Sequence, residues 1–228
     1  TPVAFFPDEG WVDVTQLTKI LVERARQNGA ELRFGTAVES IQREDRRVSG
    51  LCLSGGEVIP VDAVVNAAGP DTDLVAGLVG RELPLQSKNG LLVRVATKAD
   101  VLGRLFHTPH VNLRPEGTRH VLLNHGSVDE TLVAGEEERM SEKLLGHARE
   151  IVPSMAEAEI EEIRVGRRPI PADGVSCVGA VSGLPGYYEA VTHSGVTLGP
   201  LIGRLLTQEI LTGEVDSLLA PFRPDRFD

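Results

Sequence analysis

Apolar positions along this chain follow two periods, one typical of helices and one typical of strands. Leu17, Ile20 and Leu21 recur at the spacing of one helical face, and Asp13 or Thr15 can cap the start of that helix. Later stretches repeat this spacing or place a capping residue before an apolar run. The pattern predicts helices over residues 13–28, 71–78, 136–151 and 195–211, the last ended by Gly213.

Short runs rich in branched residues, separated by glycine and charged turn residues, indicate strands between these helices. The runs predict strands over residues 30–34, 37–41, 48–53, 57–60, 90–97, 111–114, 120–124, 175–178 and 187–191. Residues 61–68 differ from the others because their apolar run is almost continuous. Such a run suits a strand that is buried on both faces of a parallel sheet.

The order of these elements predicts a mixed fold, α/β in one part and α+β in the other. Between about residues 83 and 165, strands separated by turns and one helix indicate an antiparallel sheet with a helix on it. The parallel-type strand and the glycine-rich segments lie before and after that stretch. We therefore expect two interleaved units, residues 1–80 with 166–228 in one and residues 81–165 in the other.

Composition narrows the function classes. The chain has 33 acidic and 23 basic residues, a formal net charge of -10. Without a basic stripe to neutralise phosphates, neither nucleic acid nor an anionic membrane is an expected partner. No apolar run approaches the roughly 18–20 residues that span a bilayer. Cys52 and Cys177 follow neither a metal-binding nor a C-x-x-C spacing, so we expect no metal site and two reduced, buried thiols in a cytoplasmic protein.

Three segments carry residues that point to a ligand. In the first, residues 64–70, the small residues Ala67, Ala68 and Gly69 follow a predicted strand. Small residues let the main chain approach a ligand closely, and in open α/β sheets ligands bind at the carboxyl ends of strands. The alternative is a tight strand-to-helix turn without a ligand.

The second segment, residues 166–174, places Arg167 and Arg168 before an extended proline-rich stretch. A fixed arginine is a natural partner for a substrate carboxylate, because its guanidinium can donate two parallel hydrogen bonds. The alternative is a surface arginine pair or a structural salt bridge.

The third segment, residues 192–203, places Gly195, Gly199 and Gly203 four residues apart on one helical face. Glycine costs a helix roughly 1 kcal/mol per position, so three on one face indicate the close approach of another backbone or of a ring. The helix start also offers free N–H groups and the positive end of the helix dipole. The alternative is plain tight helix packing, and His193 taken alone is more often structural than catalytic.

One motif is absent from the sequence. The chain has 24 glycines, yet no two are separated by a single residue, so there is no G-x-G-x-x-G. That turn cradles the phosphates in dinucleotide-binding folds. A Walker-type loop is absent as well.

Taken in order, the segments resemble the family of FAD enzymes that contains glycine oxidase, sarcosine oxidase and D-amino-acid dehydrogenase. The resemblance covers residues 10–227, and its motifs are specific through their order and spacing rather than one by one. They are Gly10–Asp13 before the first helix, Thr36–Val38, Asn66–Pro70, Arg114–Gly117, Gly166–Gly174 and His193–Pro200.

The resemblance implies a partial FAD-binding domain of the glutathione-reductase type, interleaved with an antiparallel-sheet substrate domain. It also implies FAD as cofactor and oxidation of an amino acid or N-methylated amine by hydride transfer to the flavin. It implies that Arg168 binds the substrate carboxylate and that His193, with Tyr187 or Tyr188, lines the substrate pocket. The residues it implies near the cofactor are Val38, Ala67, Ala68, Gly69, Gly195, Val196, Thr197 and Leu198.

Members of this family carry a βαβ unit with the G-x-G-x-x-G motif before the matching region. Such a unit needs roughly 30 residues, whereas nine precede Gly10. We expect a chain without it to bind FAD weakly or not at all. The alternatives are a non-catalytic fragment or interaction module that associates as a homo-oligomer, and one subunit of a split oxidoreductase completed by a separate N-terminal partner.

Overall fold

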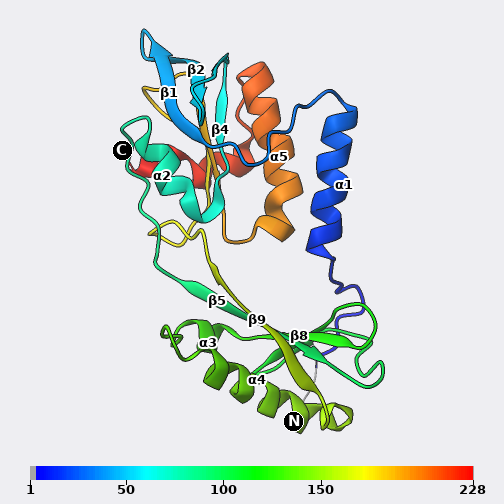
Figure 1. Ribbon diagram of the computed structural model, residues 1–228. Coiled ribbons are helices and arrows are strands. Elements are labelled where there is room, and N and C mark those ends of the chain that lie inside the picture. Colours follow the sequence, from blue (N-terminus) through cyan, green and yellow to red (C-terminus); the bar gives the residue numbers. More distant parts are fainter. Residues whose placement is uncertain (1–3, 228) are drawn as a thin grey trace. The chain divides into compact units, whose positions relative to one another are not determined.

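The computed structural model describes residues 4–227, and residues 1–3 and 228 lie outside the described residues. The chain divides into two compact units (Figure 1). Unit 1 contains the residues up to Ala30 together with Lys88–Arg167, and unit 2 contains Glu31–Ser87 together with the residues from Arg168 onward. This division differs from the expected one, because the residues up to Ala30 group with the antiparallel sheet.

Contacts of the segment before the first helix explain this grouping. The Arg104 guanidinium lies over the Phe5 ring, 4.8 Å from its centroid, and His107 Nε2 lies 3.0 Å from Glu9 Oε1. The first helix itself, α1 (Val14–Gln27), has no buried residue. It begins as predicted, since the Asp13 side chain accepts a hydrogen bond from the main chain of the first turn.

Unit 1 is built on a five-stranded antiparallel sheet with the strand order β6-β7-β8-β5-β9. Three of its strands were predicted, and β6 and β9 were not. The apolar positions of β9 are irregular, and a register shift interrupts its pairing with β5, which hides the period of two. The elements are β5 (Asn89–Ala96), β6 (Phe106–His107), β7 (Asn112–Pro115), β8 (His120–Asn124), α3 (Gly126–Asp129), α4 (Glu137–Ile151), η2 (Pro153–Met155) and β9 (Glu159–Arg167).

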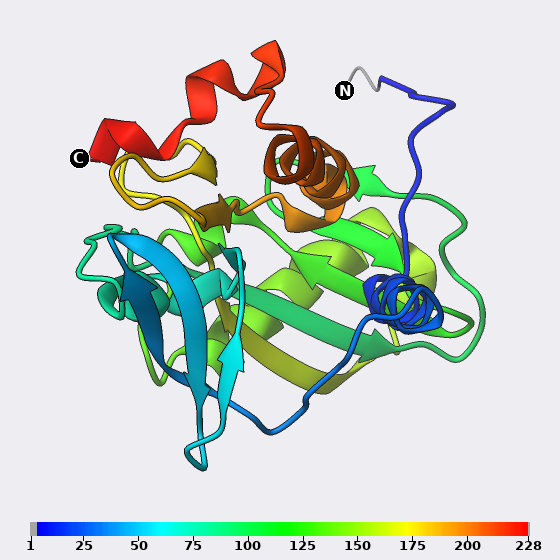
Figure 2. The ribbon, with the colours of Figure 1, turned by 90° about the horizontal axis from the view of Figure 1, so that it is seen from above.

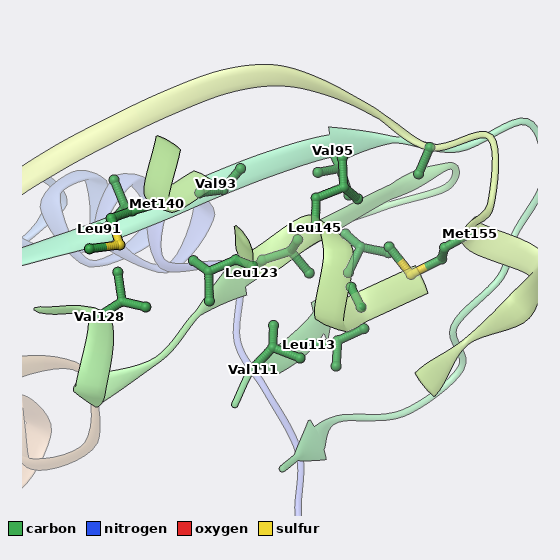
Figure 3. Packing of buried hydrophobic residues seen from close by; sticks show 14 residues of the cluster. Leu91, Val93, Val95, Val111, Leu113, Leu123, Val128, Met140, Leu145 and Met155 are labelled. Carbon is green, nitrogen blue, oxygen red and sulfur yellow. The ribbon is translucent and has the colours of Figure 1, made fainter. Parts of the chain in front are cut away.

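The core of unit 1 lies between one face of this sheet and α4 (Figure 3). Leu91, Val93 and Val95 alternate along β5, so all three side chains point to the same face, where they are at most 1% exposed. Leu144 and Leu145 of α4 pack against that face and are equally buried. The predicted arrangement of an antiparallel sheet with a helix on it is therefore confirmed for this unit.

Unit 2 contains an antiparallel meander of three strands, as predicted: β1 (Val38–Glu44), β2 (Arg47–Leu53) and β3 (Val58–Pro60). Figure 2 shows these strands side by side. Asp45 and Arg46 connect the first two with φ values of 49° and 70°, as a two-residue hairpin turn of type I′ requires. Residues 30–34 form no strand, and none of the described strands pairs with them.

The second sheet of unit 2 has the order β10-β11-β4, formed by β10 (Cys177–Ala180), β11 (Tyr187–Val191) and β4 (Val64–Asn66). β4 runs parallel to β11, as its apolar run suggested. The expectation that this strand is buried on both faces is wrong, since Val65 is 42% exposed. The reason is that the Val65 side chain lines an open groove on one face of the sheet.

Helices follow the strands of this second sheet. α2 and α5 were predicted, and α5 ends at Gly213, whose φ of 75° is the left-handed conformation that favours glycine. Short 3-10 turns order the C-terminal tail. The elements are η1 (Gly69–Asp71), α2 (Thr72–Gly77), α5 (Gly195–Thr212), η3 (Ser217–Phe222) and η4 (Pro224–Phe227).

Candidate functional site

A groove of about 480 Å³ in unit 2 brings together residues from all three segments singled out in the sequence, although the second segment contributes Pro169 alone. The carboxyl ends of β4 and β11 form one wall, and one face of α5 forms the other. The lining is mainly apolar or small. It consists of Val65, Ala67, Gly69, Pro169, Ala190, Thr192, Gly195, Gly199, Ile202, Gly203, Leu206, Thr207 and Ile210.

The glycine face of α5 is open. A Cβ atom built on Gly195, Gly199 or Gly203 would meet no other atom within 4 Å, counting the described residues. All three glycines line the groove. Tight packing against another helix was the alternative explanation for these glycines, and no described residue packs against them in this way.

The start of α5 offers hydrogen-bond donors at one end of the groove. The first helical bond runs from Leu198 N to Ser194 O, 2.9 Å. The N–H groups of Gly195, Val196 and Thr197 precede that bond, and no described residue accepts from them. Because the helix dipole also places partial positive charge here, this end of the groove favours a group with negative charge.

The turn after β4 forms the opposite side of the groove. Gly69 has a φ of 59°, a left-handed conformation in which a side chain would be strained. The Thr72 hydroxyl donates to Gly69 O at 2.7 Å, and Asn66 Oδ1 accepts from Ala68 N at 3.3 Å. Side chains on both sides of the turn thus fix the path of the main chain.

Several residues expected at the site do not line the groove. Val38 lies on the meander and is 36% exposed, and His193 is exposed, with Nδ1 3.2 Å from the Ser194 hydroxyl. Arg168 is half-buried and engaged by other groups, and its neighbour Pro169 lines the groove. The remaining expected residues, Ala68, Val196, Thr197 and Leu198, are sequence neighbours of lining residues.

Neither tyrosine lines the groove. Tyr187 is completely buried, and its hydroxyl accepts a hydrogen bond from Asn66 Nδ2 at 2.9 Å. Burial raises the pKa of the Tyr187 hydroxyl well above its usual range. Tyr188 is half-buried and packs against the apolar cluster that includes Leu205. The Tyr187 side chain therefore points into the core, and the expectation that Tyr187 or Tyr188 lines the substrate pocket stays a prediction.

Sequence reasoning missed a buried charged cluster in unit 2. Glu189 is 0% exposed, and its carboxylate accepts from Arg81 Nε at 2.9 Å and from the Cys177 thiol at 3.1 Å. Burial, together with the Glu189 carboxylate, raises the pKa of the Cys177 thiol. The signal in the sequence was one charged residue, Glu189, inside an apolar strand. Cys177 is buried as expected, whereas Cys52 is only partly buried.

Residues 4–227 contain no candidate for two further classes of site, a metal centre and a membrane span. No group of three or more histidine, cysteine, aspartate or glutamate side chains there could hold a metal ion. No helix in that range is both long enough and apolar enough to cross a membrane.

The fold combines unit 2, with an antiparallel meander and a mixed sheet, and unit 1, with an antiparallel sheet. Residues 3–209 match the sequence model of the family described as FAD dependent oxidoreductase, DAO. The chain belongs to this family. The resemblance to it and the mixed fold predicted from the sequence are thereby confirmed.

Individual relatives agree with this assignment. The chain is 29% identical over 201 residues to glycine oxidase of Pseudomonas aeruginosa, covering 85% of this chain and 54% of that protein. It is 26% identical over 215 residues to hydrogen cyanide synthase subunit HcnC of the same organism, covering 93% of this chain and 52% of the relative. The chain thus spans about half the length of these curated relatives.

A solved structure is also similar. The crystal structure of glycine oxidase from Geobacillus kaustophilus superposes with a TM-score of 0.81 at 27% sequence identity, over 96% of this chain and 60% of that chain. The family implies FAD as the cofactor. The groove is chemically compatible with part of FAD, since it combines apolar walls, an open glycine face and N–H donors at the start of a helix.

Proposed function

We propose that this chain is part of an FAD-dependent enzyme that oxidises an amino acid or an N-methylated amine. Membership of the family supports the cofactor, and similarity to glycine oxidases supports the substrate class. The observation that carries the proposal is the groove of unit 2, where the open glycine face of α5 meets the carboxyl end of β4. Few side chains intrude there, so a flat ring system can approach the main chain closely.

When bound, the flavin would take up a hydride from the substrate carbon beside nitrogen, leaving an imine that water hydrolyses. The N–H groups of Gly195, Val196 and Thr197 would stabilise negative charge that develops beside them, aided by the helix dipole. Leu198 would lie at the same end. Because a neutral amine can lose a hydride directly, no side chain is assigned as an obligatory base.

Binding of the substrate is assigned to Arg168, whose guanidinium would hold the carboxylate of an amino acid. His193 is proposed to lie beside the same pocket, since it stands two residues before the start of α5. On the cofactor side, the main chain of Ala67, Ala68 and Gly69 is assigned to the diphosphate, and that of Val38 to the adenine.

The roles of the two units follow from these assignments. Unit 2 is proposed as the remainder of the FAD-binding domain, and the five-stranded sheet of unit 1 as the core of the substrate domain. We also propose a cytoplasmic location. A second chain that carries the G-x-G-x-x-G motif, or a second copy of this chain, is the proposed partner, which accords with a relative that is itself a named subunit.

Binding of FAD to the purified chain tests the proposal. Flavin fluorescence is followed during a titration with FAD, for the unaltered chain, for Gly203→Leu in the groove and for Gly146→Leu on α4 as a matched helix control. The expected result is weak binding that Gly203→Leu abolishes and Gly146→Leu preserves. Equal binding by both variants would show that FAD does not use the groove.

The substrate class is tested with the same chain after it has been loaded with FAD and mixed with a second chain that carries the G-x-G-x-x-G motif. Glycine, sarcosine and a D-amino acid are added without oxygen, and the visible flavin band is recorded. Bleaching by at least one of them is expected. If none bleaches the band, while a chemical reductant does, the chain is not part of an amine oxidoreductase.

A further inference from the structure

Below the turn after β4, three buried side chains form a connected polar unit, which we name the Asn66 clamp. Its members are Asn66, Thr72 and Tyr187, which are 2%, 0% and 0% exposed. They come from three elements, since Asn66 ends β4, Thr72 begins α2 and Tyr187 begins β11. All three residues belong to unit 2.

The carboxamide of Asn66 uses both of its ends. Nδ2 donates to Thr72 O at 2.9 Å and to the Tyr187 hydroxyl at 2.9 Å. Oδ1 accepts from Ala68 N at 3.3 Å. The hydroxyl of Thr72 completes the unit by donating to Gly69 O at 2.7 Å. The clamp therefore forms hydrogen bonds with the turn at Ala68 N and at Gly69 O. Its other end, the Tyr187 side chain, is buried in the core.

The clamp leaves specific main-chain groups available. It occupies the N–H of Ala68, whereas no described residue accepts from the N–H groups of Ala67 and Gly69. Ala67 and Gly69 are also the two residues of this turn that line the groove. A main chain with free donors at the end of a parallel strand suits an anionic oxygen of a ligand.

A buried polar network whose groups are all satisfied makes its surroundings rigid and selects one geometry. In this chain no buried side-chain polar atom of the described residues lacks a partner. The carboxamide, which bonds in three directions, fixes a turn that a leucine at the same position would leave undetermined.

We propose that Asn66, held in place by the Tyr187 hydroxyl, is a positioning residue that keeps the N–H groups of Ala67 and Gly69 available to an anionic oxygen of the dinucleotide cofactor. The inference rests on the proposed function, because it takes the cofactor to be FAD. It adds a residue that acts through the main chain and does not itself touch the ligand.

Two variants and one control test this role. Tyr187→Phe removes one hydroxyl and leaves the ring in the core, and Asn66→Ala removes every bond of the carboxamide. Tyr188→Phe is the matched control, since it removes a tyrosine hydroxyl from the adjacent position of the same strand. Circular dichroism and thermal unfolding establish that each variant is folded, and Tyr187→Phe carries the test if Asn66→Ala does not fold.

Amide NMR of the chain reports on single N–H groups, so it distinguishes a local change at the turn from a change in overall stability. Hydrogen exchange at Ala68 is expected to accelerate at least tenfold in Asn66→Ala and severalfold in Tyr187→Phe, and to stay unchanged in Tyr188→Phe. Addition of FAD is expected to shift the amide signals of Ala67 and Gly69 in the unaltered chain. Those shifts should shrink at least threefold in both clamp variants and persist in the control.

The outcomes separate the two proposals. FAD-induced shifts at Ala67 and Gly69 that persist at full size in the clamp variants would overturn the positioning role and leave the proposed function intact. If FAD shifts neither amide in the unaltered chain but shifts those of Gly195 and Thr197, the clamp does not serve the cofactor. If FAD alone shifts no amide, the titration is repeated with a chain that carries the G-x-G-x-x-G motif present, and the absence of any shift there as well would overturn both proposals.

Discussion

Arg81 and Glu189 form an ion pair in the interior of unit 2, with Arg81 Nε 2.9 Å from Glu189 Oε1. Their side chains are 8% and 0% exposed. Arg81 also donates through Nη2 to Pro224 O at 2.7 Å, so the same guanidinium connects the β11 carboxylate to the C-terminal tail. Such a pair adds little net stability while intact, but losing one partner leaves a buried charge uncompensated.

Arg81→Met should therefore lower the free energy of unfolding by about 3–5 kcal/mol, the usual effect of breaking a buried pair. Urea unfolding measures this loss. The double variant Arg81→Met/Glu189→Leu should recover part of it, because no unpaired carboxylate remains. Arg33→Met, which removes the exposed pair with Glu57, is the control and should cost no more than about 1 kcal/mol. A double variant as unstable as the single one would contradict the explanation.

Gly203→Ala separates helix stability from ligand binding. The new methyl group meets no neighbour within 4 Å among the described residues, and alanine favours a helix over glycine by up to about 1 kcal/mol. The chain should thus unfold at higher urea concentration while its affinity for FAD falls severalfold. Gly146→Ala on α4 should bring the same stabilisation without the loss of affinity. Equal FAD affinity in both variants would count against the groove as the binding site.

Cys177 should make stability depend on alkaline pH. Burial raises the pKa of its thiol in the folded chain, whereas a thiol in the unfolded chain ionises near about pH 8.5. The unfolded state alone then releases a proton as the pH rises. The free energy of unfolding should be unaffected below about pH 8 and then fall by at most about 1.4 kcal/mol per pH unit.

Urea titrations between about pH 7 and pH 9.5, where tyrosine contributes little, measure this slope. Cys177→Ser keeps a hydroxyl that can donate to Glu189 and should flatten the decline. Cys52→Ser, outside the buried cluster, should retain it. A Cys177→Ser variant with the slope of the unaltered chain would exclude this thiol as the cause.

Arg168→Ala should weaken substrate binding in the FAD-loaded, complemented enzyme. Loss of a two-pronged contact with a carboxylate costs a few kcal/mol, or more than tenfold in KM. Amine substrates without a carboxylate should be unaffected, which distinguishes a binding role from a general loss of structure. Arg167→Ala is the control at the adjacent position. Unchanged KM for an amino acid in Arg168→Ala would remove this residue from the site.

Local patterns in the sequence predicted most of the fold. Asp13 and Gly213 mark the start of α1 and the end of α5, because capping depends on neighbours along the chain. The strand predicted at residues 30–34 was wrong, because apolar composition alone does not supply a pairing partner. β9 was missed because its bulged pairing with β5 breaks the alternation of apolar positions.

The site was predictable in part for a similar reason. Glycines four residues apart and small residues after a strand are visible in the sequence, and the structure brings Ala67, Gly69 and Gly195 to one groove. The buried carboxylate of Glu189 and the clamp at Tyr187 depend on contacts between residues more than 100 positions apart. No local period encodes such contacts.

Each unit is built from two separate stretches of the chain, and this order along the sequence determines which unit can fold first during synthesis. Every described element of unit 1 has been synthesised once Arg167 has left the ribosome, whereas β10, β11 and α5 of unit 2 have not. The first part of unit 2, Glu31–Ser87, is made before the about 80 residues of Lys88–Arg167. Synthesis of those residues takes roughly 4–16 s at usual elongation rates. During that interval β11, the described strand that pairs with β4, has not been made, so the β4 edge that β11 later covers is open to chaperones.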